Sequence, residues 1–459
     1  MDVVVPVRQK GELTRASKLI TTGSTVPKVP RCANVSIEKT LWFNRLRLLG
    51  TFAVGQGLTQ GIGIITGFLL LRWLSVEDYA QFSLAFGFQC TLALLCDLGI
   101  STSIVNLVGA RGDEPAVIGQ YVTAARWLRN RLFITLLPIG AVAFHWFADR
   151  HGWSLREQIT LYGLTALSLF LQTTTAWYAA PLIIHKRLTA SYGAGLASAA
   201  GRLGATGFLQ FAGFLNASGT YLVNTVALML NAALVRRASR SLLLEETVEN
   251  PAIRREMITY LVPIIPGMIF FAFQGQLTIF LISIFGTTES VAEVGALGRL
   301  AQMFTALTAL SGAVICPYFA RLPTEKVPRR YALTIAGAIA AACALTLFAH
   351  AWGDPVQWLL GPRYRDMHSE SVGMIAASSI SFVAALMHGV ALARKWVRWW
   401  VSIAGIVVIV CVQVAMVLLL DLSTTSSVVW FSVGTAFAMV IAQAITALYA
   451  CWNFNAEGE

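Results

Sequence analysis

The chain has 459 residues, of which 56% are hydrophobic and only 12% are charged, about half the charged fraction of an ordinary soluble domain. It carries 34 Lys and Arg against 23 Asp and Glu, which gives a formal net charge of +11. Low charge with high apolarity excludes a cytosolic enzyme, a secreted disulfide scaffold and a disordered protein, and predicts a multi-span membrane protein. A basic excess can also indicate nucleic-acid binding, so its location along the chain decides its meaning.

The apolar segments follow a polar, basic N-terminal tail at 1–47, which does not have the pattern of a cleaved signal peptide. Each segment is about long enough to cross ~30 Å of hydrocarbon at ~1.5 Å per residue. We therefore expect an all-α integral membrane protein with about twelve transmembrane helices. The predicted spans are 48–73, 80–109, 132–148, 158–184, 188–215, 218–235, 257–285, 291–320, 331–350, 371–393, 399–420 and 427–449.

The positive-inside rule orients these spans. With the N-terminus inside, the tails and inner connections hold 27 Lys and Arg, and the outer connections hold 5. Both termini are therefore predicted to be cytoplasmic. The basic excess is a topology signal, so no nucleic-acid partner is expected. Only Arg202 and Arg299 remain inside predicted spans.

The longest inner connection, 236–256, divides the spans into two sets of six. We predict an N-lobe at 48–235, a cytoplasmic inter-lobe loop at 236–256, a C-lobe at 257–449 and a cytoplasmic C-terminal tail at 450–459. Because six is even, the two lobes should enter the membrane with the same orientation. The proline pair Pro263 and Pro266 makes the seventh span the one most expected to bend.

No motif for chemistry is present. The sequence contains no Walker-type phosphate loop, no H-E-x-x-H and no G-x-S-x-G. Its seven cysteines offer no disulfide framework, and no group of His, Cys, Asp and Glu has metal-ligand spacing. The outer connections are also short for an acceptor-binding domain. We expect no catalytic residue, no metal and no cofactor, and we predict a transporter and not an enzyme.

Four ionisable residues lie within or at the edge of apolar spans: Asp97, Arg202, Glu293 and Arg299. A charge at the bilayer centre costs at least about 2.5–3.5 kcal/mol on insertion scales, so each should face a partner or an aqueous cavity. The planar fork of arginine matches phosphate oxygens. Arg202 and Arg299 are therefore predicted to bind an anionic head group in a water-filled cavity, and internal ion pairing is the alternative. Asp97 and Glu293 are candidates for charge pairing or ion coupling.

Amides, hydroxyls and aromatic rings within the spans suit the binding of sugars. Helix–helix hydrogen bonding uses the same groups, so both interpretations stay open. The candidate sugar-binding residues are Gln172, Thr174, Trp177, Tyr178, Gln276 and Gln302.

Several short segments together resemble one family. They are the glycine-rich first span within 48–109, the turn Leu74-Ser75-x-Glu77-Asp78-Tyr79, the triplet Asp97-Leu98-Gly99, the pattern Val294-Gly295…Arg299-Leu300…Pro317, and Trp358-Leu359-Leu360-Gly361-Pro362-x-Tyr364. With the six-plus-six layout, they resemble the polysaccharide transporters, the Wzx-type O-antigen and exopolysaccharide flippases of the MOP superfamily. The motifs are also similar to those of lipid II flippases and MATE-type exporters. One departure is Gln274-Gly275-Gln276-Leu277 in the seventh span, where members of the family often carry an Asp.

The resemblance implies two six-helix lobes around a central cavity and transport by alternating access. It implies translocation of an undecaprenyl-diphosphate-linked oligosaccharide across the bacterial inner membrane, for surface or exopolysaccharide biosynthesis. The expected partners are this lipid-linked oligosaccharide, membrane lipids, and assembly proteins such as a polysaccharide polymerase. The alternatives are a MATE-like exporter of small molecules and a membrane polysaccharide polymerase or ligase.

Overall fold

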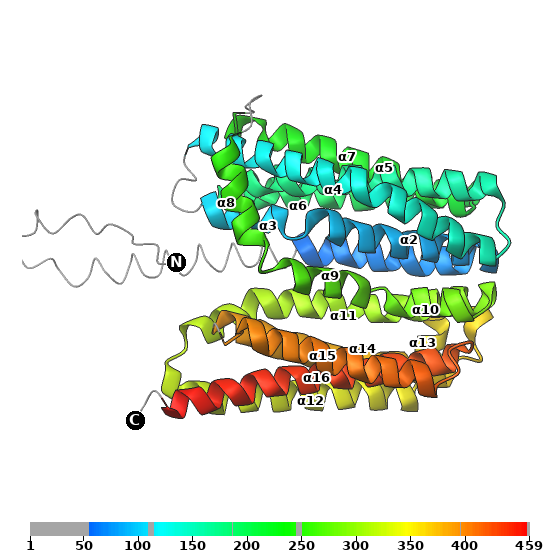
Figure 1. The fold of residues 1–459 in the computed structure, drawn as a ribbon. Helices are drawn as coiled ribbons and strands as arrows, with labels where there is room; N and C mark the ends of the chain where they lie inside the picture. The colour runs from blue at the N-terminus through cyan, green and yellow to red at the C-terminus, as the bar shows by residue number, and fades with distance from the viewer. Residues whose placement is uncertain (1–54, 109–113, 186, 245–249, 395, 457–459) are drawn as a thin grey trace, which may run out of the picture. The chain divides into compact units, whose positions relative to one another are not determined.

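The computed structural model describes residues 55–108, 114–185, 187–244, 250–394 and 396–456. Within these ranges every regular element is a helix (Figure 1). Nine of the described helices are long and apolar enough to cross a membrane, or ten if one bent pair counts as a single span. The predicted all-α, multi-pass fold class is confirmed.

Helices cover each predicted span of the first half, although the span predicted at 48–73 is described only from residue 55. A helix at 55–73 comes first. It is followed by α2 (Val76–Asp97), α3 (Ile100–Val108), α4 (Pro115–Arg150), α5 (Leu155–Ile184), α6 (Leu188–Phe211) and α7 (Ala217–Ser239), with the short 3-10 turn η3 (Arg240–Leu242). Side chains cap several of the starts: Ser154 and Glu157 form a reciprocal capping box at α5, and Asn216 caps α7.

The second predicted span is broken into α2 and α3. Leu98 has φ 41° and Gly99 has φ 83°, so the chain passes through the left-handed region for two residues. The carboxylate of Asp97 then accepts a hydrogen bond from the backbone N–H of Ser101, at 3.2 Å, in the first turn of α3. The helix break is therefore built from the sequence Asp97-Leu98-Gly99 itself.

The second half contains α8 (Pro251–Leu261), α9 (Ile265–Gln274), α10 (Leu277–Phe285), α11 (Thr288–Arg321), α12 (Val327–Ala351), α13 (Gly353–Leu360), α14 (His368–Ala393), α15 (Trp399–Leu419) and α16 (Thr425–Ala456), with η4 (Thr324–Lys326) and η5 (Pro362–Tyr364). The seventh predicted span is divided among α8, α9 and α10. The chain bends by 62° between α8 and α9, at Pro263, which confirms the predicted bend. A second break, at Gly275 and Gln276, was not predicted.

The helices form two groups that meet along α2 (Figure 1). In the first group, α7 packs against α5 and α6. In the second, α14 packs against α11, α12 and α16, and α15 packs against α16. Between the groups, α2 lies against α9, α10 and α11. The segment α8 packs on α3 and α4, so the beginning of the seventh span lies against the first group. The predicted lobe boundaries stay a prediction.

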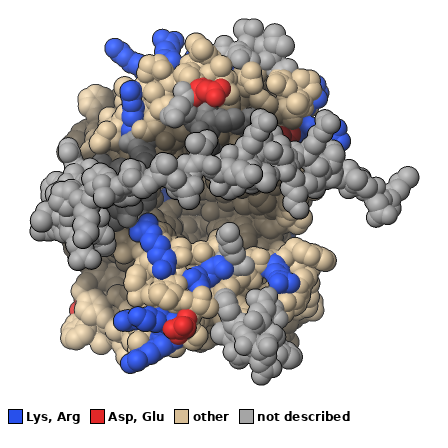
Figure 2. Space-filling view, turned by 90° about the vertical axis from the view of Figure 1, so that its left-hand side faces the viewer, with Lys and Arg blue, Asp and Glu red and all other residues tan. Residues whose placement is uncertain are grey.

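The turns that follow the first, third, fifth and seventh spans were all predicted to lie at the outer side, and contacts bring them together at one end. Asp78 at the start of α2 accepts a hydrogen bond from the backbone N–H of Ala217, at 2.9 Å, and His151 contacts Thr288. Figure 2 views the opposite end, where Lys and Arg side chains lie on both groups and the surface is hollowed between them. We call the end with Asp78 and His151 the predicted outer end, since the orientation in the membrane stays a prediction.

Candidate functional site

A cavity of about 620 Å³ lies between the two helix groups. This volume is within the usual range for small-molecule sites, about 300–1,000 Å³. The 55–73 helix, α2, α6 and α7 supply one side, and α10, α11 and the break before α10 supply the other. Arg202 and Arg299 are the charged residues among those that line it, and no Asp or Glu is among them. The described wall of the cavity is therefore cationic.

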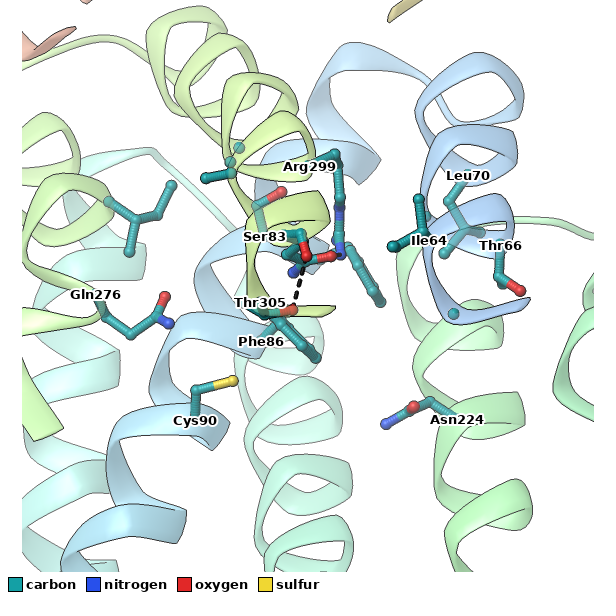
Figure 3. Close-up of a pocket in the computed structure, with 18 of the residues that line it drawn as sticks. Ile64, Thr66, Leu70, Ser83, Phe86, Cys90, Asn224, Gln276, Arg299 and Thr305 are labelled. Carbon is teal, nitrogen blue, oxygen red and sulfur yellow. Dashed lines mark hydrogen bonds between the residues drawn. The ribbon is translucent and has the colours of Figure 1, made fainter. Parts of the chain in front are cut away.

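Arg299 of α11 is 7% exposed and lies at the contact between the groups. Its Nε donates to the hydroxyl of Tyr79 at 3.0 Å, and its Nη1 donates to Oε1 of Gln302 at 3.1 Å. The guanidinium carbon lies 5.4 Å from the ring centroids of both Phe82 and Phe86, within reach of a cation–π interaction. In Figure 3 Arg299 reaches the cavity near Phe86 of α2.

Arg202 of α6 enters the same cavity from the first group. Its Nη1 donates to Oδ1 of Asn224 at 3.2 Å, while its Nε is buried without a hydrogen-bond partner. A buried donor without a partner is unfavourable by about 1–3 kcal/mol or more. This guanidinium therefore retains capacity for a ligand.

Both arginines lie over one face of the 55–73 helix. A Cβ atom on Gly63 would lie 3.5 Å from Nη2 of Arg202, and a Cβ on Gly67 would lie 3.1 Å from Cδ of Arg299. These glycines are four residues apart and share a helix face. The two positive charges are close enough to repel each other, and within the described chain neither has an acidic partner. The predicted alternative of internal ion pairing is therefore not what the structure shows for these arginines.

Two of the six candidate sugar-binding residues, Gln276 and Gln302, line this cavity. The other four do not. Gln172 accepts a hydrogen bond from Nε2 of Gln89 at 3.0 Å, and Thr174 donates to the carbonyl of Phe170 within its own helix, at 2.7 Å. Both use their polar groups between or within helices, as the alternative interpretation of this region predicted. The sugar-binding role itself stays a prediction.

Trp177 and Tyr178 contact two arginines, which lie in the predicted inner connection between the spans at 80–109 and 132–148. Arg129 is 2% exposed; its guanidinium carbon lies 4.2 Å from the Trp177 ring, and its Nη1 donates to Thr173 at 2.9 Å. Nη2 of Arg126 donates to the hydroxyl of Tyr178 at 2.9 Å. Arg202 and Arg299 are thus not the only arginines buried among the helices. The missed signal is the helical start, because Pro115 at N1 and apolar residues at 118, 122 and 125 extend α4 through this region.

Asp97 and Glu293 do not line the cavity. Asp97 caps α3 through Ser101, and Glu293 accepts a hydrogen bond from the hydroxyl of Thr425 at the start of α16. Both carboxylates therefore have local structural partners. Their proposed part in ion coupling stays a prediction.

The two groups also hold each other at the predicted outer end. Arg72 donates to the carbonyl of Trp358, and its guanidinium carbon lies 4.6 Å from that residue's ring. In the opposite direction, Arg363 donates to the carbonyl of Leu74. Each group thus supplies an arginine to a backbone acceptor of the other. We call this pair of interactions, with the nearby His151–Thr288 contact, the outer contact.

The outer contact should depend on pH through His151, which lies in the turn after α4. Burial lowers the pKa of His151 below its usual value of 6.5; a hydrogen bond to the backbone of Ser283 partly opposes this shift, and neighbouring Arg150 adds to it. The contact therefore favours neutral imidazole, whereas an exposed His151 would have an ordinary pKa. We expect the contact to be fully stable above pH ~6.5 and to weaken as pH falls below that value.

Spin labels can test this dependence. Leu155 and Asp354 are exposed residues of the two groups at the predicted outer end, so cysteines at these positions, in a chain free of its own cysteines, report the separation. The inter-label distance should lengthen between pH 7 and pH 5. In His151→Gln it should not change with pH. A titration that is identical in this variant would assign the pH response to another group.

Comparison with known structures identifies the fold. The chain is similar to a multidrug resistance MATE family transporter of the MOP superfamily in an inward-facing conformation, with a TM-score of 0.64 and 14% identity over 90% of this chain and 98% of that one. It is also similar to the lipid II flippase MurJ in an inward closed conformation, with a TM-score of 0.62 and 11% identity over 88% and 87% of the two chains. A third match is a MOP superfamily transporter from Pyrococcus furiosus, with a TM-score of 0.58 and 13% identity over 90% and 96%. The fold is that of the MOP superfamily transporters.

The family follows from the sequence. The model of the family described as "Polysaccharide biosynthesis protein" matches residues 49–323, more than half of the chain. The chain belongs to this family, and the predicted relationship to the polysaccharide transporters of the MOP superfamily is confirmed. No curated protein sequence matches the chain.

Proposed function

We propose that the protein is a flippase that moves an undecaprenyl-diphosphate-linked oligosaccharide across the bacterial inner membrane by alternating access, for surface or exopolysaccharide biosynthesis. The observation that carries this proposal is the cavity with two arginines and no described acidic residue. A diphosphate does not cross hydrocarbon unaided, and a guanidinium is the side chain that best matches its oxygens. No bond is made or broken, so no catalytic residue is required.

The geometry suggests how such a substrate would be held. Arg202 and Arg299 lie above glycines one helical turn apart, so a compact anion with two charged centres can contact both. Gln276 and Gln302, which also line the cavity, offer amides for sugar hydroxyls. The lipid tail would remain in the bilayer, outside the gap between the helix groups. A lipid II flippase among the similar folds supports a lipid-linked substrate.

The two alternatives fit the cavity less well. An exporter of cationic drugs needs acidic groups to offset the charge of its substrate, and none is among the described lining residues. A polymerase or ligase would bind the diphosphate outside the membrane, where Arg363 is engaged with Leu74. Partner assembly proteins, including a polymerase, remain part of the proposal.

Reconstitution in liposomes tests the function. Undecaprenyl diphosphate carrying a fluorescent oligosaccharide is placed in the membrane, and the fraction reached by a membrane-impermeant quencher is followed with time. We expect the protein to accelerate flipping, and to leave efflux of the cation ethidium at the rate of empty liposomes. The mass of the lipid-linked sugar should not change. Ethidium transport without flipping would support the exporter, and a longer glycan would support the polymerase.

A further inference from the structure

Arg299 does more than face the cavity, because its surroundings belong largely to the other helix group. Tyr79, Phe82 and Phe86 lie on one face of α2, at helical spacings of three and four residues. Their ring centroids lie 6.0, 5.4 and 5.4 Å from the guanidinium carbon of Arg299. The cation of α11 is therefore held against an aromatic face of α2.

The hydroxyl of Tyr79 fixes this arrangement. Tyr79 is fully buried and makes two hydrogen bonds to α11: it accepts from Nε of Arg299 at 3.0 Å and donates to the carbonyl of Gly295 at 3.2 Å. A phenol has one hydrogen to donate. Since that hydrogen is directed to Gly295, the oxygen is left to accept from Arg299. One side chain of α2 thus holds both the backbone of α11 and its charged side chain.

The two helices are unusually close at this point. A Cβ atom on Gly295 would lie 2.4 Å from Oγ of Ser83 and 3.3 Å from Cε1 of Tyr79. No real Cβ approaches so near, so only glycine permits this contact. Both hydrogen bonds of Tyr79 therefore require that α2 and α11 stay together.

We propose that Tyr79 is the positioning residue that couples occupation of the cavity to opening at the predicted outer end. An anion that draws the guanidinium of Arg299 into the cavity competes with Tyr79 for it, and so weakens the contact between α2 and α11. This inference rests on the proposed function, because it requires an anionic ligand at Arg299.

The hydrogen-bond partners of Arg299 decide whether an anion favours the closed or the separated arrangement of α2 and α11. In the closed arrangement, Nε and Nη1 of Arg299 are occupied by Tyr79 and Gln302. When α2 and α11 separate, more of the guanidinium becomes available to the ligand. A ligand shifts an equilibrium by its difference in affinity for the two states. The anion therefore binds the separated state more tightly and favours it, so loading promotes opening.

The variant Tyr79→Phe tests this coupling, because it keeps the ring and removes the hydroxyl. Undecaprenyl diphosphate serves as the probe, and its Kd is measured in lipid nanodiscs. We expect binding to become tighter by about threefold to tenfold, the equivalent of one hydrogen bond that no longer competes. Labels at positions 155 and 354 should report a larger open fraction without ligand, and a smaller ligand-induced increase than in the unmodified chain. A purely structural defect would not tighten binding.

Tyr221→Phe is the matched control. Tyr221 is also fully buried, but its hydroxyl bonds to Ala85 and Gln89 on α2, within the first helix group. Its loss should change neither the Kd nor the response of the labels. If Tyr79→Phe does not fold, the labels in the unmodified chain carry the test, since undecaprenyl diphosphate should increase the open fraction and an unchanged fraction would contradict the coupling.

The outcomes separate the two proposals. If the unmodified chain binds the probe and Tyr79→Phe has the same or weaker affinity and the same label response, the coupling is wrong while the proposed function stands. If the unmodified chain does not bind undecaprenyl diphosphate, the proposed function fails, and the coupling fails with it.

Discussion

Replacing Arg202 and Arg299 together by glutamine is expected to reduce flipping by more than about 100-fold. A hydrogen bond to a charged group contributes about 1.5–3 kcal/mol, and each 1.4 kcal/mol is a factor of about ten. Each single replacement should therefore reduce the rate by about 10- to 100-fold. The measurement is the quencher-based flipping rate at a limiting substrate concentration, normalised to the amount of folded protein.

Two control variants test whether the loss of flipping is specific to the arginines of the cavity. Arg365→Gln removes an exposed arginine at the predicted outer end and should leave the rate unchanged. Arg299→Lys keeps the charge but loses the planar fork, so it should retain part of the activity that Arg299→Ala loses. Equal flipping rates with arginine, lysine and alanine at position 299 would show that this side chain does not bind the head group.

Stability separates a binding defect from a folding defect. Arg202 has a buried Nε without a partner, and neither cavity arginine has an acid beside it in the described chain. Removing a buried charge that lacks an opposite charge relieves a desolvation penalty. Arg202→Gln should therefore unfold at the same temperature as the unmodified protein or higher, whereas Arg299→Gln also loses the contacts of its guanidinium to Tyr79 and Gln302. A fall in the melting temperature of Arg202→Gln that parallels its fall in flipping would indicate that this arginine acts in folding.

The helices were predictable because apolar length is a strong local signal in a membrane chain. Arg202 and Arg299 were predictable for the related reason that a charge inside an apolar run is rare. The same reasoning failed at Arg129. Three arginines lie close together in this part of the sequence, which is typical of an inner connection, so a buried position was not predicted. The helix α4 begins at Pro115, and aromatic rings from α5 cover this charge. Those rings come from a different span, so no local pattern reveals them.

Tyr79 shows a second limit of the sequence. Its segment resembles the outer turn of a family, and α2 indeed begins at Val76. The partners of its hydroxyl lie 216 and 220 residues away on α11. Which face of α2 meets α11 depends on how the two helix groups pack. The triplet Asp97-Leu98-Gly99 is the opposite case, because its residues form the break between α2 and α3 locally.

Gly295→Ala is expected to push α2 and α11 apart, because the new Cβ would overlap Ser83. The Cβ would lie 2.4 Å from Oγ and 2.8 Å from Cβ of Ser83, so α2 and α11 must move apart. Overpacking of this kind costs about 1–3 kcal/mol, which lowers the ratio of closed to open arrangements by about 5- to 150-fold. Labels at positions 155 and 354 should show a longer distance, and flipping should fall because the outer contact no longer forms.

A double variant tests whether the overlap with Ser83 is the cause. In Gly295→Ala with Ser83→Gly, both clashing atoms of Ser83 are gone, so the helices should approach again and flipping should recover in part. Gly312→Ala, on the same helix with no atom near its Cβ position, should behave as the unmodified chain. If the double variant is as impaired as Gly295→Ala, the close approach of α2 and α11 does not control closure. If it recovers, the spacing of these two helices sets whether the predicted outer end can shut, and the hydroxyl of Tyr79 acts at this point of close approach.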